Sequence, residues 1–523
     1  MTLQKYPIGV QTFSSIIEDG YNYVDKTHFI PLLVRQSKFV FLSRPRRFGK
    51  SVMLSTLEAY FEGRRELFKG LAIYDMDVDW TSHPVLHFDF NAGVYDDAEG
   101  LLMRLDATLG YHENKYGLPI SSKDRSVIPI RFENLIRNVY KQTGRKVVIL
   151  VDEYDKPLLG LEEDEKAFES NQKLLKSFFG CLKSMDRYIR FCFVTGVARF
   201  SKVSIFSDMN NLDDISMDNQ YADICGWTAA EMLDVFQSGI EALASERGEC
   251  FDNTLKALRD YYDGYLFTPK GSRLYNPYSV LRALKAKEIN PFWFGTGTPT
   301  FLVKRVKSKG IAPTDINGQI CTKDELLEVG LGSSNPIPLM FQTGYLTIDS
   351  YDQQTGLYKL RFPNIEVEIG FYRYLFPLYI PENMNHGTEF EFSNFKKELF
   401  SGQVEEFMKR LATLLKALPG DDHCESTYRA ITYLLCTLCG TYTIAENRSY
   451  KGRSDLEVLT PNYIYIFEFK YNKSVEDAMA QIYSRDYAGP YALDFRQVYL
   501  IGANLDENKD RRGLTYKIEK MEP

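Results

Sequence analysis

The sequence predicts an α/β protein made of several domains, and three observations lead to this prediction. The chain has 523 residues, which is too long for a single hydrophobic core and indicates about two to four domains. Two apolar runs, residues 38–43 and 146–151, have the length and composition of strands buried in a parallel sheet. Residues 455–460 and 463–471 have the pattern of two further strands joined by a tight turn.

Composition narrows the classes of function. Hydrophobic residues make up 44% of the chain and aromatic residues 14%, which is ample for a buried core. The formal net charge is −7, so a nucleic-acid partner would need a local basic patch. No apolar run has the length of a membrane span, and the first residues lack a signal-peptide pattern. Cys436 and Cys439 lie close together in an apolar run that predicts a buried helix rather than a metal site. These features favour a reducing cytoplasm.

Residues 44–51 resemble a phosphate-binding loop with an unusual beginning. Gly49, Lys50 and Ser51 match the end of the pattern G-x-x-x-x-G-K-[ST], but Arg44 stands where the first glycine belongs. A strand pattern precedes the loop and a helical one follows it, so the helix N-terminus would offer free N–H groups to an anion. Lys50 would then reach the β- and γ-phosphates, and the Ser51 hydroxyl would bind Mg²⁺. On the loop alone, a basic surface turn is an equal alternative.

An acidic strand end favours the nucleotide site. Asp152 and Glu153 follow the run at 146–151, at the end of the strand where ligands bind in open α/β sheets. Asp152 would hold Mg²⁺ through water, and Glu153 would polarise the attacking water. A simple acidic turn is the alternative. A third strand pattern, residues 187–196, places Thr195 where it can face the γ-phosphate, although Thr-Gly is also an ordinary strand exit.

The C-terminal strand pair predicts a metal site. If Pro461 and Asn462 form a two-residue turn, Asp455 lies opposite Glu468, with Cβ atoms about 4.5–5.5 Å apart, and Lys470 projects from the same face. Two opposed carboxylates repel each other unless a cation lies between them. Such carboxylates bind Mg²⁺ or Mn²⁺, and the lysine would position or activate a water that attacks a phosphodiester. The alternative is an exposed face on which Lys470 forms an ion pair with either carboxylate.

These stretches together resemble the bacterial AAA-ATPase-like family whose members carry a PD-(D/E)xK nuclease-like domain at the C-terminus. In that family the loop similarly reads R-P-R-R-F-G-K-S. The matching stretches, which cover residues 23–280, are YVDKTHFI, FLSRPRRFGKS, LVDEYDKP, VTGVARFSKVSIFSDMNNLDDIS, YYDGYLF and YNPYSV.

The resemblance implies a P-loop NTPase parallel sheet followed by smaller domains. We expect an AAA-ATPase-like P-loop domain at 1–225, a helical lid at 226–330, a small winged-helix-like segment at 331–380 and an α/β PD-(D/E)xK nuclease-like domain at 381–523. The segment 227–325 is mostly helical in pattern, 336–362 is strand-like, and 377–392 looks like a linker.

The resemblance also implies further site residues. Arg44, Arg46 and Arg47 would surround the triphosphate with charge, or else line a nucleic-acid or subunit surface. Arg199 is a candidate for reading the nucleotide state, with an ordinary surface arginine as the alternative. The nucleotide-binding residues expected are Arg46, Arg47, Phe48, Gly49, Lys50, Ser51, Asp152 and Thr195. Asn210, Asn211 and Asp213 match the family without a mechanism.

In the nuclease-like part, Glu425 matches the glutamate that often completes the metal site, although a first-turn glutamate also complements a helix dipole. Gln481 matches a glutamine of the following helix, but Arg485 occupies the slot of its tyrosine partner and Tyr487 lies beyond. Gly452 and Arg453 match too, and the glycine would allow the backbone to approach the substrate.

Together these features predict an ATP-binding, Mg²⁺-dependent switch or motor fused to a nuclease that uses Mg²⁺ or Mn²⁺ on DNA. Defence, mobile-element handling and repair are the settings considered, and a homo-oligomer is left open. One alternative is a signalling switch whose C-terminal domain binds nucleic acid or protein without cutting. Another is a nucleotide binder that never hydrolyses.

Overall fold

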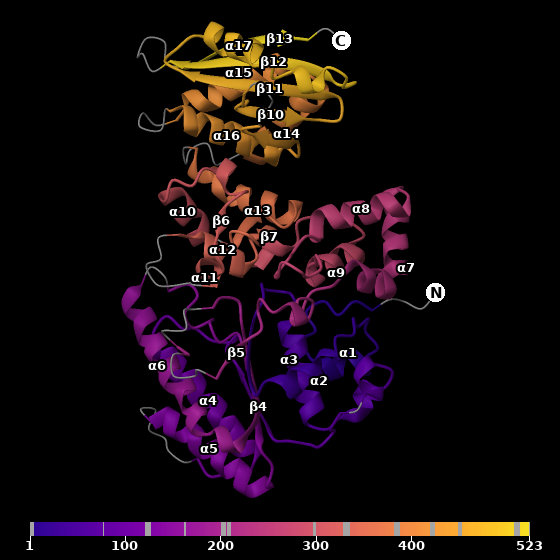
Figure 1. Cartoon of the computed structure of the whole chain (residues 1–523), viewed down its shortest axis with the longest axis vertical. Helices are drawn as coiled ribbons and strands as arrows, with labels where there is room; N and C mark the ends of the chain where they lie inside the picture. The colour runs from indigo at the N-terminus through magenta and orange to yellow at the C-terminus, as the bar shows by residue number, and fades with distance from the viewer. Residues whose placement is uncertain are drawn as a thin grey trace. The chain divides into compact units, whose positions relative to one another are not determined.

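The computed structural model describes residues 5–76, 78–120, 127–161, 164–199, 205–206, 211–296, 300–327, 335–380, 388–418, 424–447, 452–506 and 513–521. The chain forms two compact units (Figure 1). The first comprises Met1–Thr296 with Gly318–Val367, and the second comprises Gly297–Asn317 with Glu368–Pro523. No helix in the described ranges is long and apolar enough to cross a membrane.

A five-stranded parallel sheet forms the centre of the first unit. Its strand order is β2-β3-β4-β1-β5, so the predicted parallel sheet is confirmed. Every residue of β3 is buried, because β-branched and aliphatic side chains pack on both of its faces. The strand bounds are β1 (Phe39–Ser43), β2 (Val85–Asp89), β3 (Val147–Asp152), β4 (Ile189–Gly196) and β5 (Asp213–Asp214).

Helices cover both faces of this sheet. The earlier ones, α1 to α3, lie on one side of it and α4 to α6 on the other (Figure 1). Aromatic rings pack on the side of α4 to α6, where Phe132 of α5 and Phe178 of α6 stack with ring centroids 4.5 Å apart. The helices are α1 (Phe13–Glu18), α2 (Phe29–Gln36), α3 (Lys50–Phe61), α4 (Ala98–Lys115), α5 (Ile128–Thr143) and α6 (Glu165–Ser184).

A helical subdomain follows, as the sequence predicted. Its helices α7 (Ala229–Arg247), α8 (Phe251–Tyr262) and α9 (Pro277–Ala286) share one apolar core. The YNPYS stretch begins α9, because the Asn276 side chain caps the helix and Pro277 occupies its first turn. The turn before it requires Gly264, whose φ is 107°, and a Cβ there would lie 2.1 Å from the Pro363 carbonyl oxygen.

A small antiparallel sheet completes the first unit. The expectation that residues 336–362 are all strand-like is wrong for the first part of that range. Residues 339–343 belong to a helix, α12 (Ile337–Thr343), which begins with a proline in its first turn and ends at Gly344 in the left-handed region. A short apolar run alone does not distinguish a helix from a strand. The sheet has the order β6-β8-β7, with β6 (Ile320–Cys321), β7 (Thr347–Asp352), β8 (Leu357–Arg361) and, beside it, α11 (Lys323–Leu327).

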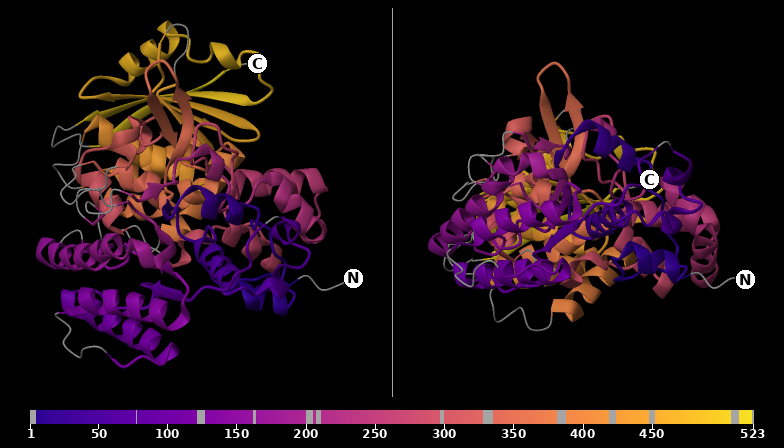
Figure 2. Two further views of the ribbon diagram at one scale, coloured as in Figure 1. Left: turned by 60° about the horizontal axis from the view of Figure 1, so that its bottom comes forward. Right: turned by 90° about the horizontal axis from the view of Figure 1, so that it is seen from below.

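The second unit is built on a mixed sheet of order β13-β12-β11-β10-β9, in which only the described pair β11–β12 is parallel. Ile464 and Ile466 pack under α17 on one face, whereas Phe467 meets Phe407 of α15 on the other. Figure 2 (left) shows helices on both faces of this sheet. The strands are β9 (Tyr442–Ala445), β10 (Leu456–Leu459), β11 (Tyr463–Tyr471), β12 (Gln497–Asp506) and β13 (Gly513–Lys520).

The helices of the second unit include part of the expected linker. Residues 388–392 lie in α14 rather than in a linker, and residues 381–387 lie outside the described ranges. Helix α13 begins in the first unit and continues into the second. The helices are α10 (Thr300–Ser308), α13 (Ile365–Leu375), α14 (Thr388–Ser401), α15 (Val404–Lys416), α16 (Glu425–Leu438) and α17 (Val475–Ser484). Cys436 is buried in α16 and Cys439 directly follows it, so the pair lies in the helical core, as expected.

Candidate functional site

The phosphate-loop candidate connects β1 to α3, as the sequence predicted. Strand β1 ends at Ser43, and α3 begins at Lys50 with Gly49 as its cap residue. Gly49 has φ 94°, a left-handed conformation that favours glycine. The free N–H groups at the beginning of α3 therefore face the position that an anion would take.

The Asp152 carboxylate brings together two other predicted residues, Ser51 and Thr195. Asp152 Oδ2 accepts a hydrogen bond of 2.5 Å from the Ser51 hydroxyl, and Oδ1 accepts one of 2.6 Å from the Thr195 hydroxyl. The three meet because β1, β4 and β3 are adjacent and parallel, so their carboxyl ends share one edge of the sheet. Carboxylate and hydroxyl oxygens are the hard ligands that Mg²⁺ prefers, so this group fits the metal that the sequence predicted.

Lys50 and Glu153 lie on the same edge of the sheet. The Lys50 ammonium is buried and donates to the carbonyl oxygens of Arg44 and Pro45, at 2.9 and 3.1 Å. It would exchange these carbonyls for phosphate oxygens when a nucleotide binds. Glu153 has φ 50°, a conformation that is uncommon outside glycine, and it lines the cavity described next.

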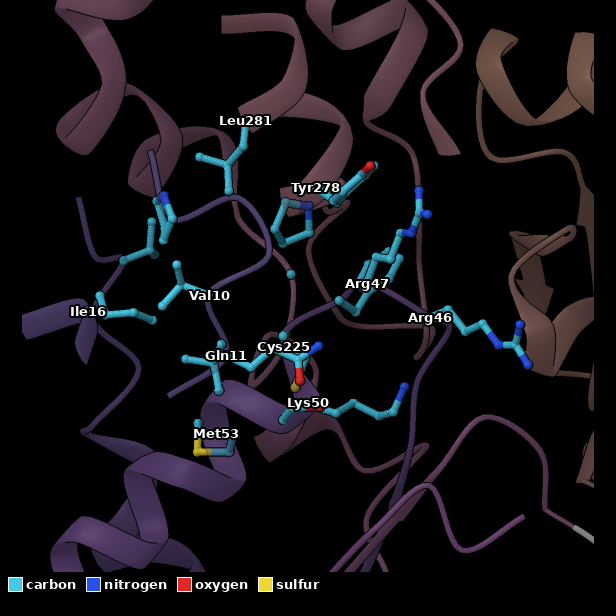
Figure 3. A pocket seen from close by; sticks show the side chains of 18 of the residues that line it. Val10, Gln11, Ile16, Arg46, Arg47, Lys50, Met53, Cys225, Tyr278 and Leu281 are labelled. Carbon is cyan, nitrogen blue, oxygen red and sulfur yellow. The ribbon is translucent and has the colours of Figure 1, made fainter. Parts of the chain in front are cut away.

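A cavity of about 430 Å³ lies beside the loop, which is a size typical of small-molecule sites. Val10, Gln11 and Ile16 lie on one side of it, and the cationic side chains of Lys50, Arg46 and Arg47 extend on the other (Figure 3). With Val10, Ile16, Met53 and Leu281 in its lining, the cavity has a mostly apolar end, where Gln11 is the polar side chain, and a positively charged end. The sequence interpretation missed lining residues outside the loop, among them Pro7, Ile8, Gly9, Val10, Gln11, Tyr23, Cys225, Tyr278 and Leu281.

Arg44 has no place in this cavity, which corrects the expectation that it contacts the triphosphate or lines a surface. Its side chain is 1% exposed, and its guanidinium donates to the carbonyls of Ser216 and Tyr221, at 2.8 and 3.0 Å. It also lies 4.3 Å from the ring centroid of Phe267. Burial lowers the pKa of Arg44 to about 10. The planar, forked guanidinium suits several carbonyl acceptors at once, so Arg44 holds the beginning of the loop.

The other loop side chains divide between the cavity and the core. Arg47 lies 3.9 Å from the ring centroid of Tyr278 and donates to the carbonyls of Phe292 and Trp293. Arg46 lines the cavity and makes no side-chain hydrogen bond or ion pair with any described residue. Phe48 also borders the cavity, but its ring is 1% exposed and packs against Tyr265 and Phe267, so it stabilises the loop from the core side.

The candidate for reading the nucleotide state, Arg199, lies apart from the cavity lining. Its guanidinium forms a mostly buried ion pair of 2.8 Å with Asp214 of β5. Asn211 lies in a turn, Asp213 accepts a hydrogen bond from the Ser37 hydroxyl, and Asn210 lies outside the described residues. Neither the ion pair nor these neighbours gives the stretch a catalytic role.

A buried aspartate that the sequence interpretation passed over connects the ends of β3 and β4. Asp155 Oδ2 accepts hydrogen bonds from the N–H groups of Val197 and Ala198, at 2.9 and 2.6 Å. Burial raises the pKa of Asp155 to about 6. It holds the turn that carries Glu153 against the strand end that carries Thr195.

The second candidate site lies on the hairpin of β10 and β11, whose predicted register is confirmed. Leu456 pairs with Phe467 and Leu459 with Ile464, so Asp455 and Glu468 are the next opposed positions. Asp455 Oδ2 accepts a 2.8 Å hydrogen bond from the Phe469 N–H.

Lys470 pairs with one of the two carboxylates on this hairpin. Its ammonium lies 2.5 Å from Glu468 Oε1, and the side chains of Lys470 and Glu468 are 12% and 2% exposed. The alternative of an ion pair on an exposed face is therefore wrong: the pair exists, but it is buried.

Glu468 carries the unusual electrostatics of this site. Burial and the nearby Asp455 charge raise the pKa of Glu468 to about 7, although the Lys470 ammonium opposes the rise. Its Oε2 is buried without a hydrogen-bond partner among the described residues. A buried carboxylate oxygen without a partner costs free energy, and a hard cation would remove that cost. Glu468 and Asp455 therefore fit a divalent metal.

Glu425 lies at the edge of this site. It is the first residue of α16, and its charge contributes to the raised pKa of Glu468. Within the described ranges no three His, Cys, Asp or Glu side chains are grouped closely enough to hold a metal. The pair of Asp455 and Glu468 thus forms the centre, with Glu425 outside it.

Arg429 is a neighbour that the sequence interpretation missed. It lies on α16, 3.3 Å from Asp455 Oδ1 and 3.5 Å from Glu446 Oε1, and Arg453 also pairs with Glu446 at 3.0 Å. One turn of helix separates it from Glu425, and that i, i+4 spacing was the only available sequence signal. The carboxylate of Asp455 is thus balanced by a cation in this structure.

The structure explains why Tyr487, rather than the residue at position 485, is the tyrosine partner of Gln481. Helix α17 ends at Ser484, so the chain turns back and brings Tyr487 within 3.0 Å of the Gln481 amide, to which it is hydrogen-bonded. The Tyr487 hydroxyl in turn donates to the Arg453 carbonyl. A Cβ on Gly452 would lie 2.9 Å from Arg485 Cδ, so the close approach that the glycine permits is to Arg485.

Comparison with known proteins agrees with the two domain types. Residues 7–206 match the family described as predicted AAA-ATPase, and residues 423–513 match the PD-(D/E)XK nuclease superfamily. A protein described as "uncharacterized protein in vnfD 5′region", from Azotobacter chroococcum mcd 1, is 36% identical over 528 residues, which cover 97% of this chain and 98% of the relative. The chain belongs to this AAA-ATPase-like family. The predicted resemblance is confirmed, and the two matches support a fusion of an ATPase-type and a nuclease-type domain.

Arg44 and Arg46 of this AAA-ATPase-like protein should respond differently to the same substitution. Arg44→Lys should lower the free energy of unfolding by about 2–4 kcal/mol, because an ammonium cannot satisfy the buried carbonyls that the guanidinium fork reaches. Arg46→Lys, two residues away, should change it by less than about 0.5 kcal/mol. Urea denaturation of both variants measures this, and equal losses would contradict the assignment of Arg44 to the core.

The carboxyl of Glu468 should make the metal-free protein less stable as the pH rises. Its pKa is raised from 4.5 to about 7, so the folded chain holds this proton more tightly than the unfolded chain. That contribution is complete below about pH 4.5 and is lost as the pH rises through about 7, a change of about 1–3 kcal/mol. Thermal unfolding of wild type and Glu468→Gln in chelator, near pH 5 and pH 8, measures it. The same pH dependence in both proteins would show that Glu468 ionises normally.

Proposed function

We propose that this protein binds and hydrolyses ATP at the cavity beside Gly49–Ser51, and that its C-terminal domain cuts DNA with a divalent metal. The observation that carries the first half is the Asp152 carboxylate, which is shared by the Ser51 and Thr195 hydroxyls beside a cationic cavity wall. The observation that carries the second half is the buried oxygen of Glu468 beside Asp455 and Lys470.

At the nucleotide site, each residue has a role that follows from its position. The base and ribose would occupy the apolar end of the cavity, and the triphosphate would lie along Gly49–Ser51 toward Lys50, Arg46 and Arg47. Ser51 and Asp152 would hold Mg²⁺, which supplies charge neutralisation at the β- and γ-phosphates. Glu153 would orient and deprotonate the attacking water, and the Thr195 hydroxyl would face the γ-phosphate.

At the nuclease site, Asp455 and Glu468 would hold Mg²⁺ or Mn²⁺, with Glu425 at the edge. The metal would polarise the scissile phosphate and lower the pKa of a bound water. Lys470 would leave Glu468 and orient that water toward phosphorus. Arg429 and Arg453 pair with Asp455 and Glu446 in the metal-free chain, and Arg429 would turn to the DNA backbone once a metal takes its place beside Asp455. Defence, mobile-element handling and repair are processes that use metal-dependent cleavage of DNA, and they are the settings that we propose for this protein.

The nucleotide half predicts two separable defects. Lys50→Ala should weaken ATP binding by roughly ten- to a hundredfold, because it removes a charge-assisted contact with phosphate. Glu153→Gln should bind ATP normally and lower turnover by roughly 10²- to 10⁴-fold, because it removes the general base. Lys115→Ala, which removes a lysine of α4 that pairs with Glu62, is the matched control. Calorimetry and phosphate release measure both effects, and normal turnover in both variants would contradict the assignment.

The nuclease half predicts a different separation. Asp455→Ala should lose metal binding and DNA cleavage together, because it removes a ligand. Lys470→Ala should keep metal binding and lose cleavage by roughly 10²-fold or more, because its role begins once the metal is bound. Lys473→Ala removes an exposed lysine of the same strand end and should change neither. Metal titration with cleavage assays decides the question. If the wild-type protein binds DNA but binds neither Mg²⁺ nor Mn²⁺, the nuclease assignment is contradicted and a domain that binds DNA without cutting it is favoured.

A further inference from the structure

Arg47 connects the nucleotide cavity to a segment beside the domain boundary. It lines the cavity with Tyr278, and its Nη1 donates to the carbonyls of Phe292 and Trp293, at 3.2 and 3.1 Å. The Trp293 indole N–H also points to the Arg46 carbonyl, at 3.5 Å. The chain leaves the first unit after Thr296, only three residues beyond Trp293.

A buried glutamate connects the same segment to another place where the chain changes units, after Val367. Glu366 is 0% exposed, and its Oε1 accepts hydrogen bonds from the N–H groups of Phe292 and Trp293, at 2.6 and 2.8 Å. Glu366 lies in the first turn of α13, and the chain enters the second unit after Val367, within that helix. The carbonyls of Phe292 and Trp293 are thus held by the loop, and their N–H groups by α13.

This arrangement connects one backbone segment to two of the three places where the chain passes between the units. Phe292 and Trp293 precede the crossing after Thr296, and Glu366 precedes the crossing after Val367. On one side of the segment the partner is the Arg47 guanidinium, a charged group that makes stronger hydrogen bonds than a neutral one does. A change at Arg47 therefore acts on the segment that Glu366 holds from the other side.

We propose that Arg47 transmits nucleotide occupancy to the second unit by releasing Phe292 and Trp293 when the triphosphate binds. This inference rests on the proposed ATP site. A phosphate oxygen is a stronger acceptor for a guanidinium than a neutral carbonyl is, so a bound triphosphate competes with the two carbonyls for Arg47. The segment then loses its contact with Arg47 and keeps its contact with Glu366, so its backbone is held less firmly. In the nucleotide-free state, Arg47 holds the carbonyls of Phe292 and Trp293.

Hydrogen exchange at the N–H groups of Phe292 and Trp293 tests this directly. In wild type, a non-hydrolysable ATP analogue with Mg²⁺ should speed their exchange by about tenfold, because one of the two anchors is lost. In Arg47→Ala, exchange should be fast without nucleotide and should not change on its addition. Glu366→Gln lies outside the cavity lining, so it should bind the analogue as wild type does and exchange faster in both states. Arg273→Ala removes an arginine that donates to the Gly264 carbonyl elsewhere in the unit and should behave as wild type.

Calorimetric titration of the analogue into each protein separates the two hypotheses. Wild type that binds the analogue while exchange at Phe292 and Trp293 stays unchanged would overturn the coupling and leave the ATP site intact. Wild type that does not bind the analogue at all would overturn both. The coupling is supported if the analogue binds wild type and speeds exchange at Phe292 and Trp293, while exchange in Arg47→Ala stays constant.

Discussion

The buried guanidinium of Arg44 is the constraint on which the proposed nucleotide site depends. A glycine at this position would leave the beginning of the loop free, whereas Arg44 ties it to backbone carbonyls of the segment after β5. The following loop residues are held in the same way. Pro45 lies against Gly344, where a Cβ would approach within 2.7 Å, Arg47 stacks on Tyr278, and Phe48 packs on Tyr265. The loop is therefore defined by side-chain packing where other phosphate loops rely on glycine. Arg47 and Gly49 both adopt left-handed backbone, with φ of 70° and 94°.

Two buried glutamates on the hairpin of the second unit have different roles: one stabilises the fold, and the other is a candidate metal ligand. Glu457 accepts hydrogen bonds from Ser454, Asn447 and Tyr491, at 2.7, 2.7 and 2.5 Å, so both of its oxygens have partners. Glu468, across the hairpin, has one ion pair and one oxygen without a partner among the described residues. The first arrangement stabilises the strand beside Asp455. The second is costly in a metal-free chain, which is the property expected of a ligand that awaits a cation.

The sequence predicted the parts of the protein in which local pattern determines structure. Continuous aliphatic runs predicted β1 and β3, and the turn at Pro461 predicted the pairing of Asp455 with Glu468, because strand register follows from simple geometry. It did not predict contacts between distant segments. Arg44 was expected at the triphosphate or on a nucleic-acid or subunit surface, because its charge was visible and its burial was not. Arg429 and Tyr278 were missed because only the fold brings them to their sites. The helix at Ile337–Thr343 was mistaken for a strand because a short apolar run fits both.

A crystal structure with Mg²⁺ and a non-hydrolysable ATP analogue would test the central claim most directly. The account predicts that Lys50 leaves the carbonyls of Arg44 and Pro45 for the phosphates, and that Ser51 and Asp152 face the metal. It also predicts that Arg44 stays on Ser216 and Tyr221. A nucleotide bound away from Gly49–Ser51, or an Arg44 side chain that turns out of the core to meet the phosphates, would contradict it.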